Sequence, residues 1–221
     1  MKKRRLSILL SIVMLFSLLP TTALAASPDD AVALYNGNKK LISLSDGQCL
    51  TANNADSATS YTSGDSYVAR YESSSGTLYL KGYEGVGAQG GIVANGDLNI
   101  VVESNSSFTT SRTSNDNLMG IQSGNGKLNI SGNGKLTVSA NGNGDVYGIY
   151  AKEGVTISAP LDVTVGENDT AKNDSVYGIY TMSGAISLSG GEKTITAMSG
   201  STGAAYAVYN KVQTSSTGAD N

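Results

Sequence analysis

The sequence contains no histidine, one cysteine and only three prolines in 221 residues. Without histidine the chain cannot build a Ser–His or Cys–His catalytic pair, or a metal site with histidine ligands. The single cysteine, Cys49, excludes an intrachain disulfide, and we expect it to be a small buried residue rather than a reactive thiol. The fold must therefore be stabilised by backbone hydrogen bonds and an apolar core.

Positive charge is scarce beyond the first few residues. Lys2, Lys3, Arg4 and Arg5 precede the apolar stretch 6–19, which Pro20 and the pattern Ala23-Leu24-Ala25 follow. This order is typical of a secretory signal peptide, here residues 1–25, because the apolar stretch is shorter than the about 20 residues that a membrane span needs. No cysteine lies directly after the apolar stretch, where a lipid anchor would be attached. We therefore expect a secreted, extracellular or cell-surface protein without membrane insertion after cleavage.

Removal of residues 1–25 leaves 11 lysines and arginines against 18 aspartates and glutamates, a net charge of −7. Only two arginines remain, Arg70 and Arg112. Nucleic acid and anionic membranes attract basic surfaces, so this balance excludes them as expected partners.

A repeated tetrapeptide is the most informative feature of the chain. Tyr-Gly-Ile-Tyr occurs at Tyr147–Tyr150 and at Tyr177–Tyr180, and Tyr206–Tyr209 is a looser copy. The apolar anchors of this pattern recur at a nearly constant interval, at Ile92, Ile121, Ile149, Ile179 and Val208. A period of about 29 residues is typical of a solenoid, in which each unit buries its apolar face by stacking on its neighbours.

Each repeat contains three short alternating segments between turns rich in Gly, Asn and Ser, and no window has helical spacing. We therefore predict an all-β fold, a parallel β-helix with about four rungs of 28–30 residues each. Strict alternation would turn Ile149 and Ala151 inward and Gly148 and Tyr150 outward. Asn95-Gly96 and Asn125-Gly126 occupy one corner, where we expect a positive φ.

The chain is expected to divide into a cap and a solenoid. Residues 26–89 contain two predicted hairpins, one around Asn36-Gly37 and one joining 67–71 to 77–80, and would cover the end of the solenoid. Residues 90–212 form the predicted repeats. Residues 213–221 have no apolar pattern, and we expect either a flexible tail or the start of a continuation that leads to further domains.

Several phrases of the sequence also resemble a known group of proteins. Residues 91–100, 126–139, 147–151 and 76–83 are similar to secreted Gram-positive bacterial proteins described as carbohydrate-binding-domain-containing, and the resemblance covers roughly residues 67–210. It implies a right-handed parallel β-helix on a cell surface or in the medium. No catalytic residue is carried over from that family.

An aromatic column is the first candidate site. Tyr150, Tyr180 and Tyr209 fall on the same predicted outward position of successive rungs, about 4.8 Å apart, and could bind a polysaccharide or a surface glycan. The alternative is a purely structural aromatic ladder. Tyr147, Tyr177 and Tyr206 form a second column, which we expect to point inward or to a corner and to be structural.

A recurring carboxylate is the second candidate site. Asp116, Asp145 and Asp174 recur with the period of the repeats, each in the loop before an anchor strand. Carboxylates stacked in this way could hold Ca²⁺, whereas the alternative is an Asx-turn that closes each loop. No other cofactor is expected.

Catalysis is the third hypothesis and the weakest. A polysaccharide lyase needs a basic proton acceptor beside a metal-bound carboxylate cluster, and the lysines of the repeats lie in different columns. A glycoside hydrolase needs two carboxylates about 5–9.5 Å apart, for which Asp162 and Glu192 are conceivable. We therefore expect a non-catalytic module that binds carbohydrate or a surface partner. The alternative is a spacer or stalk within a larger adhesin.

Overall fold

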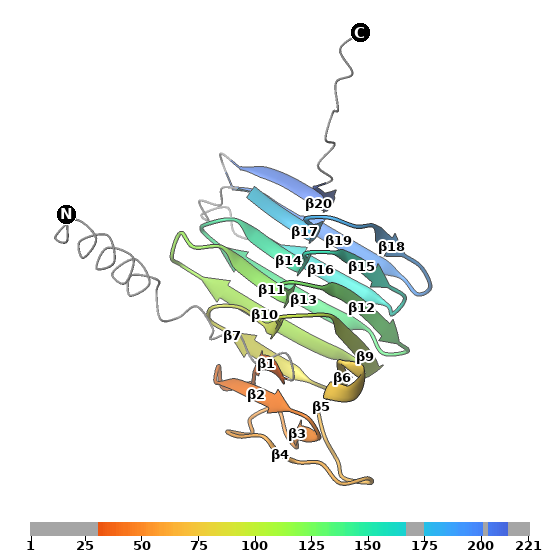
Figure 1. The fold of residues 1–221 in the computed structure, drawn as a ribbon. Coiled ribbons are helices and arrows are strands. Elements are labelled where there is room, and N and C mark those ends of the chain that lie inside the picture. The colour runs from red at the N-terminus through yellow and green to blue at the C-terminus, as the bar shows by residue number, and fades with distance from the viewer. Residues whose placement is uncertain (1–30, 167–174, 201–202, 212–221) are drawn as a thin grey trace, which may run out of the picture.

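The computed structural model describes residues 31–166, 175–200 and 203–211. In these residues the chain winds through about four turns of a parallel β-solenoid (Figure 1). Three parallel sheets form its walls, and the chain adds strands to the three sheets in rotation as it winds. The solenoid predicted from the repeat period is confirmed, whereas its handedness stays a prediction.

Each of the three sheets contains five parallel strands. We name them sheets A, B and C. Sheet A consists of β8 (Ile92–Ala94), β11 (Leu118–Ser123), β14 (Val146–Ala151), β17 (Ser175–Thr181) and β20 (Ala204–Asn210). Sheet B consists of β6 (Thr77–Lys81), β9 (Leu98–Ser104), β12 (Lys127–Gly132), β15 (Gly154–Ile157) and β18 (Ile186–Leu188). Sheet C consists of β7 (Glu84–Gly87), β10 (Ser106–Arg112), β13 (Leu136–Gly142), β16 (Leu161–Val165) and β19 (Lys193–Ala197).

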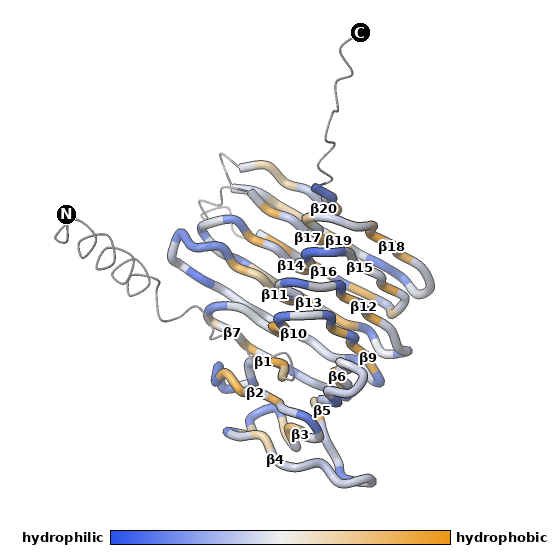
Figure 2. The backbone as a smooth tube through the Cα atoms, in the orientation of Figure 1, coloured by the Kyte–Doolittle hydropathy of each residue, from blue (hydrophilic) through white to orange (hydrophobic). Residues whose placement is uncertain are grey.

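The core is a stack of aliphatic side chains enclosed by the three sheets. The anchors Ile92, Ile121, Ile149 and Ile179 are fully buried and pair in register from turn to turn. Figure 2 shows hydrophobic residues recurring along the stacked strands, with hydrophilic residues gathered in many of the turns. Each fully buried aliphatic side chain contributes about 1.5–3 kcal/mol before the entropy cost of ordering it.

The N-terminal end is covered by antiparallel strands, and both predicted hairpins are confirmed. β1 (Ala31–Tyr35) pairs with β2 (Leu41–Ser45) and lies against β8 at the edge of sheet A. β5 (Ala69–Glu72) pairs with β6 at the edge of sheet B, and β3 (Gln48–Leu50) and β4 (Thr59–Ser60) extend it. A short 3₁₀ turn, Ser73–Ser75, joins β5 to β6.

The parallel stack begins earlier than the predicted boundary at residue 90. β6 and β7 already pair in parallel with β9 and β10, so the solenoid starts at Thr77. Tyr83, in the turn between β6 and β7, is fully buried and donates a hydrogen bond to the Tyr35 carbonyl, where it closes this end of the core. Cys49 is buried and free, as expected.

The predicted positive φ at two glycines is wrong. Neither Gly96 nor Gly126 has a positive φ, although other described glycines, such as Gly154 and Gly184, do. Gly126 is required for space instead, because a Cβ there would lie 2.4 Å from the Asp97 backbone nitrogen. The predicted signal peptide (1–25) and the C-terminal segment (213–221) lie outside the described residues. No helix in the described part of the chain is long and apolar enough to cross a membrane.

Candidate functional site

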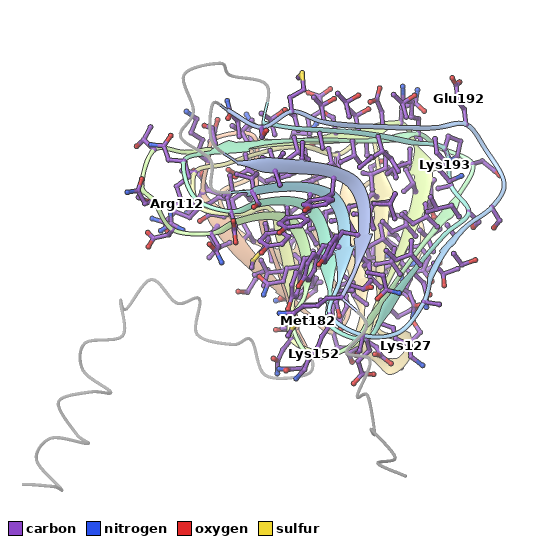
Figure 3. The ribbon with its side chains drawn as sticks, turned by 90° about the horizontal axis from the view of Figure 1, so that it is seen from above. Arg112, Lys127, Lys152, Met182, Glu192 and Lys193 are labelled. Atoms are coloured by element: carbon purple, nitrogen blue, oxygen red, sulfur yellow. The ribbon has the colours of Figure 1, made fainter. Side chains whose placement is uncertain are left out.

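The strands of sheet A bend sharply in the middle, as the view along the solenoid shows (Figure 3). In β14 the bend lies at Gly148. This residue is not paired with β17, although its neighbours Tyr147 and Ile149 are. Gly148 faces inward, because a Cβ there would lie 2.4 Å from Val163 Cγ1 of sheet C. The alternation predicted for Gly148 is therefore wrong. Gly91, Gly120 and Gly178 face sheet C in the same way on the other turns.

In each of β14, β17 and β20 this bend turns two tyrosines to the same outer face. In a straight strand, residues three apart point to opposite faces. Gly148 and Ile149 both turn inward, so Tyr147 and Tyr150 lie side by side, with their ring centroids 5.7 Å apart and their planes at 81°. Of the two placements predicted for Tyr147, Tyr177 and Tyr206, inward or at a corner, the inward one is thus wrong. They line the outer face of the bend with Tyr150, Tyr180 and Tyr209.

The six rings form one array, which we call the tyrosine ladder: Tyr147, Tyr150, Tyr177, Tyr180, Tyr206 and Tyr209. Within each column the rings are stacked face to face, with centroids 4.9 and 5.3 Å apart in one column and 5.6 and 5.5 Å apart in the other. Across the columns they meet edge to face, as Tyr177 does with Tyr180. Such pairs contribute about 0.5–1.5 kcal/mol beyond their buried area.

In the column of Tyr147, Tyr177 and Tyr206, exposure increases toward the last turn. Tyr147 and Tyr180 are each 8% exposed, whereas Tyr206 is 39% exposed. Because stacking covers both faces of the middle rings, Tyr177 and Tyr180 present mainly ring edges and hydroxyls to solvent. In the turn before the ladder, Met119 and Gln122 occupy the two columns.

Burial favours the protonated form of the four tyrosines in the first two turns of the ladder. Burial raises the pKa of Tyr147, Tyr150, Tyr177 and Tyr180 above its ordinary value of 10. At Tyr147 the nearby Asp145 carboxylate raises the pKa further, and the hydroxyl donates a hydrogen bond of 3.3 Å to Asp145 Oδ2. At neutral pH these four hydroxyls are therefore neutral and can both donate and accept hydrogen bonds.

The predicted carboxylate column has other partners. Asp116 forms an ion pair with Arg112, at 2.7 Å from Oδ2 to Nη2, and accepts a hydrogen bond from Ser114. Asp145 contacts Tyr147, and Asp174 lies outside the described residues. No group of three Asp, Glu, Cys or His ligands occurs among the described residues. The Ca²⁺ site at Asp116, Asp145 and Asp174 stays a prediction.

The conceivable pair of catalytic carboxylates does not face each other. Asp162 in β16 lies opposite Thr194, not Glu192, and its carboxylate forms an ion pair of 3.0 Å with Lys135. In this position Asp162 is held by a cation on the neighbouring turn.

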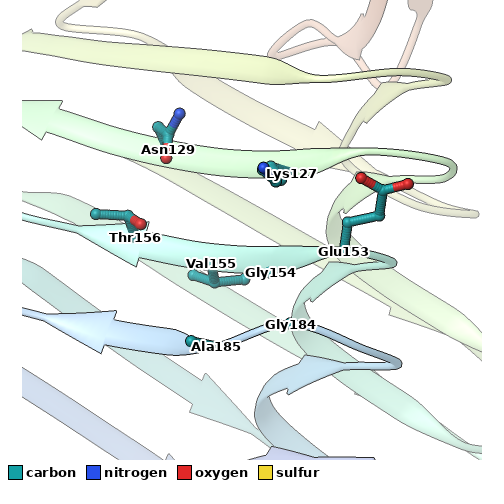
Figure 4. A pocket seen from close by; sticks show the side chains of 8 residues that line it. All are labelled: Lys127, Asn129, Glu153, Gly154, Val155, Thr156, Gly184 and Ala185. Atoms are coloured by element: carbon teal, nitrogen blue, oxygen red, sulfur yellow. The ribbon is translucent and has the colours of Figure 1, made fainter.

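A shallow depression of about 370 Å³ lies on the outer face of sheet B. It exists because Gly154, Gly184 and Ala185 have little or no side chain, while Lys127, Asn129, Glu153 and Thr156 border it (Figure 4). Its described lining contains one carboxylate, that of Glu153. Sequence reasoning missed this depression because its formation depends on which turns stack small residues on one another.

Sequence reasoning also missed a cluster of aromatic side chains around Arg70 in the N-terminal region. The guanidinium lies 4.1 Å from the Tyr79 ring centroid and 4.7 Å from that of Tyr61, and it pairs with Glu72 at 3.1 Å. The ring of Tyr67 is 5.6 Å away. The chain itself therefore supplies the cation that this aromatic cluster holds.

Comparison with known proteins gives no relative: no family model, curated protein or solved structure matches this chain.

Proposed function

We propose that this chain is a secreted or cell-surface, non-catalytic module that binds a polysaccharide along the tyrosine ladder. The observation that carries the proposal is the ladder itself, two stacked columns of tyrosines on the outside of the bend. Tyrosine combines an apolar body with a hydroxyl, and sugar rings offer apolar C–H faces beside hydroxyls. The resemblance of residues 67–210 to carbohydrate-binding proteins agrees with this proposal.

The polymer would lie parallel to the solenoid axis, because the tyrosine columns run in that direction. Each added turn repeats the same pair of hydroxyls about 4.8 Å further along. A linear chain of similar units can use such a repeat, whereas a compact ligand contacts only one or two turns. The ladder therefore favours a polymer over a small molecule.

The charge of the site favours a neutral polysaccharide. The predicted mature chain carries a net charge of −7, and the Asp145 carboxylate contacts Tyr147 at the start of the ladder. An acidic polymer would meet repulsion here, and no arginine or lysine lies within the ladder. Neutral glycans are accordingly the first ligands to test.

A structural spacer is the second candidate function, and one observation favours it. The rings of the ladder cover each other's faces, so the array also stabilises the stack of turns without any ligand. In that case the tyrosines would be an aromatic counterpart of the aliphatic core. The two functions differ in whether the ladder hydroxyls contact anything outside the chain.

A screen of the chain from Ala26 onward against neutral and acidic cell-wall polysaccharides tests the proposal. We expect binding to a neutral polymer. The double variant Tyr150→Phe, Tyr180→Phe keeps the stacking and removes two hydroxyls. At about 1 kcal/mol for each lost hydrogen bond, it should weaken binding by a factor of about 30.

Tyr61→Phe, in the N-terminal cluster, is the matched control and should bind like the unmodified chain. Replacement by alanine is less informative, because Tyr180 contacts four other rings and its removal would destabilise the fold. Absence of binding by well-folded protein would favour the spacer. Release of new unsaturated or reducing ends from any polymer would contradict the non-catalytic assignment.

A further inference from the structure

The two ends of the solenoid differ in how they are closed. At the N-terminal end, β1 and β2 continue sheet A and β5, β3 and β4 continue sheet B, all antiparallel. At the other end, β20, β18 and β19 each pair on one side only within the described part of the chain. Three neighbouring strand edges therefore present unpaired N–H and C=O groups on one surface.

This C-terminal end is also the most apolar exposed surface of the described residues. Of the six large hydrophobic side chains that are exposed, five belong to the last turn or the residue before it: Met182, Leu188, Met198, Tyr206 and Val208. Val208 is 43% exposed, although its counterpart Ile179 in the preceding turn is fully buried. The described residues thus leave the core of the solenoid uncovered at this end.

β20, the longest of the three edge strands, has none of the features that keep sheet edges apart. Natural edges are protected by charged side chains, proline or bulges. The sequences of β18, β19 and β20 contain no proline and one charged residue, Lys193. The Lys193 amine donates hydrogen bonds to the carbonyls of Ser189, Gly190 and Gly191, so its charge is engaged within its own turn.

We infer that this end pairs with the same end of a second copy, by antiparallel contact of β20 with its counterpart around a two-fold axis. Head-to-tail stacking is disfavoured in sheet B, because the N-terminal edge strand there, β4, has only two residues. A closed two-fold contact is the commonest form of self-association.

The sequence of β20 makes this contact self-complementary. In Tyr206-Ala207-Val208-Tyr209, a two-fold axis between Ala207 and Val208 places Tyr206 opposite Tyr209 of the second copy. The same axis exchanges sheets B and C, so β18 meets β19. The uncovered faces of Tyr206 and Tyr209 would stack on the partner's Tyr209 and Tyr206. The two tyrosine ladders would join into one continuous array.

The mass of the chain from Ala26 onward, measured by sedimentation equilibrium, tests the inference. We expect a dimer that does not grow further with concentration. Val208→Lys should give a monomer, because it places two ammonium groups beside the axis. Leu188→Lys, on a different sheet, should also weaken the dimer by at least tenfold in Kd.

Leu41→Lys is the matched control, since Leu41 is an exposed leucine at the opposite end of the molecule. This variant should remain dimeric. Circular dichroism and thermal melting identify the variants that fold, and only those are compared. A monomeric unmodified chain, open-ended oligomers, or a folded Val208→Lys dimer would each overturn the inference.

Discussion

At the residue scale, one glycine determines the shape of the site. Gly148 allows sheet A to approach sheet C, and this approach creates the bend that brings Tyr147 and Tyr150 to one face. The sequence contains a signal for this arrangement. Two tyrosines three residues apart, with a glycine between them, recur in successive repeats, and strict alternation cannot place both outside.

Gly148→Ala should therefore destabilise the fold. Its Cβ would lie 2.4 Å from Val163 Cγ1 and 2.7 Å from the Gly178 carbonyl oxygen. Overpacking of this kind costs about 1–3 kcal/mol. Urea denaturation would measure the loss, with Gly96→Ala as the control, because a Cβ at Gly96 meets no atom within 4 Å. Equal stability of the two variants would contradict the close approach of sheets A and C.

The tyrosines also predict how stability depends on alkaline pH. Burial, together with the hydrogen bond that Tyr67 donates to Glu103, raises the pKa of Tyr67 to about 12. Burial likewise raises the pKa of Tyr150, Tyr177 and Tyr180. A raised pKa means that the folded state holds its proton more tightly than the unfolded state. This contribution to stability is complete below pH 10 and is lost as the pH rises through the folded-state pKa.

Unfolding free energy should thus decrease from pH 10 upward, and near-ultraviolet absorbance should show phenols that ionise well above pH 10. Tyr67→Phe should remove its part of this dependence and leave that of the ladder. Titration of all tyrosines together near pH 10 in the folded protein would contradict the burial described here.

At the scale of elements, the strands of each repeat were easier to predict from the sequence than the outer surface that the stacked repeats form. Alternation and the regular spacing of the apolar anchors predicted three strands per turn, the inward residues and both N-terminal hairpins, because these depend on local pattern. For the column of Tyr147, Tyr177 and Tyr206 the sequence left an inward and a corner placement open, since the direction of Tyr147 depends on the distance between sheets A and C. The depression beside Glu153 depends on stacking across turns in the same way.

The Arg70 cluster should stabilise the N-terminal strands over the end of the solenoid. A guanidinium stacks on aromatic faces and pairs with a carboxylate in a way that an ammonium does not. Arg70→Lys should therefore lower the unfolding free energy by about 1–2 kcal/mol. Arg112→Lys is the control, because Arg112 pairs with the exposed Asp116 and such pairs contribute about 0–1 kcal/mol.

Hydrogen exchange locates the effect of the Arg70 change. Faster exchange should be confined to β3, β5 and β6, which carry or neighbour the cluster. Equal losses for Arg70→Lys and Arg112→Lys would mean that the aromatic contacts contribute nothing beyond an exposed ion pair.

At the scale of the whole molecule, the solenoid is a one-dimensional stack in which each turn contacts its neighbours. Antiparallel strands cover sheets A and B at its N-terminal end, the described residues leave its C-terminal end uncovered, and the tyrosine ladder extends to that uncovered end. Ring exposure increases in the same direction, from Tyr147 to Tyr206. A polymer bound along the ladder and a second copy paired at the open end would therefore use neighbouring parts of one surface.

Binding of neutral oligosaccharides of increasing length, followed by calorimetry, tests the central claim most directly. The first and third rings of a column are separated by two strand spacings, about 10 Å. If the polymer lies along the tyrosine ladder, affinity should rise with each added sugar until the ligand spans it, and Tyr150→Phe with Tyr180→Phe should weaken that rise. Affinity independent of length, or unchanged in the double variant, would contradict the account.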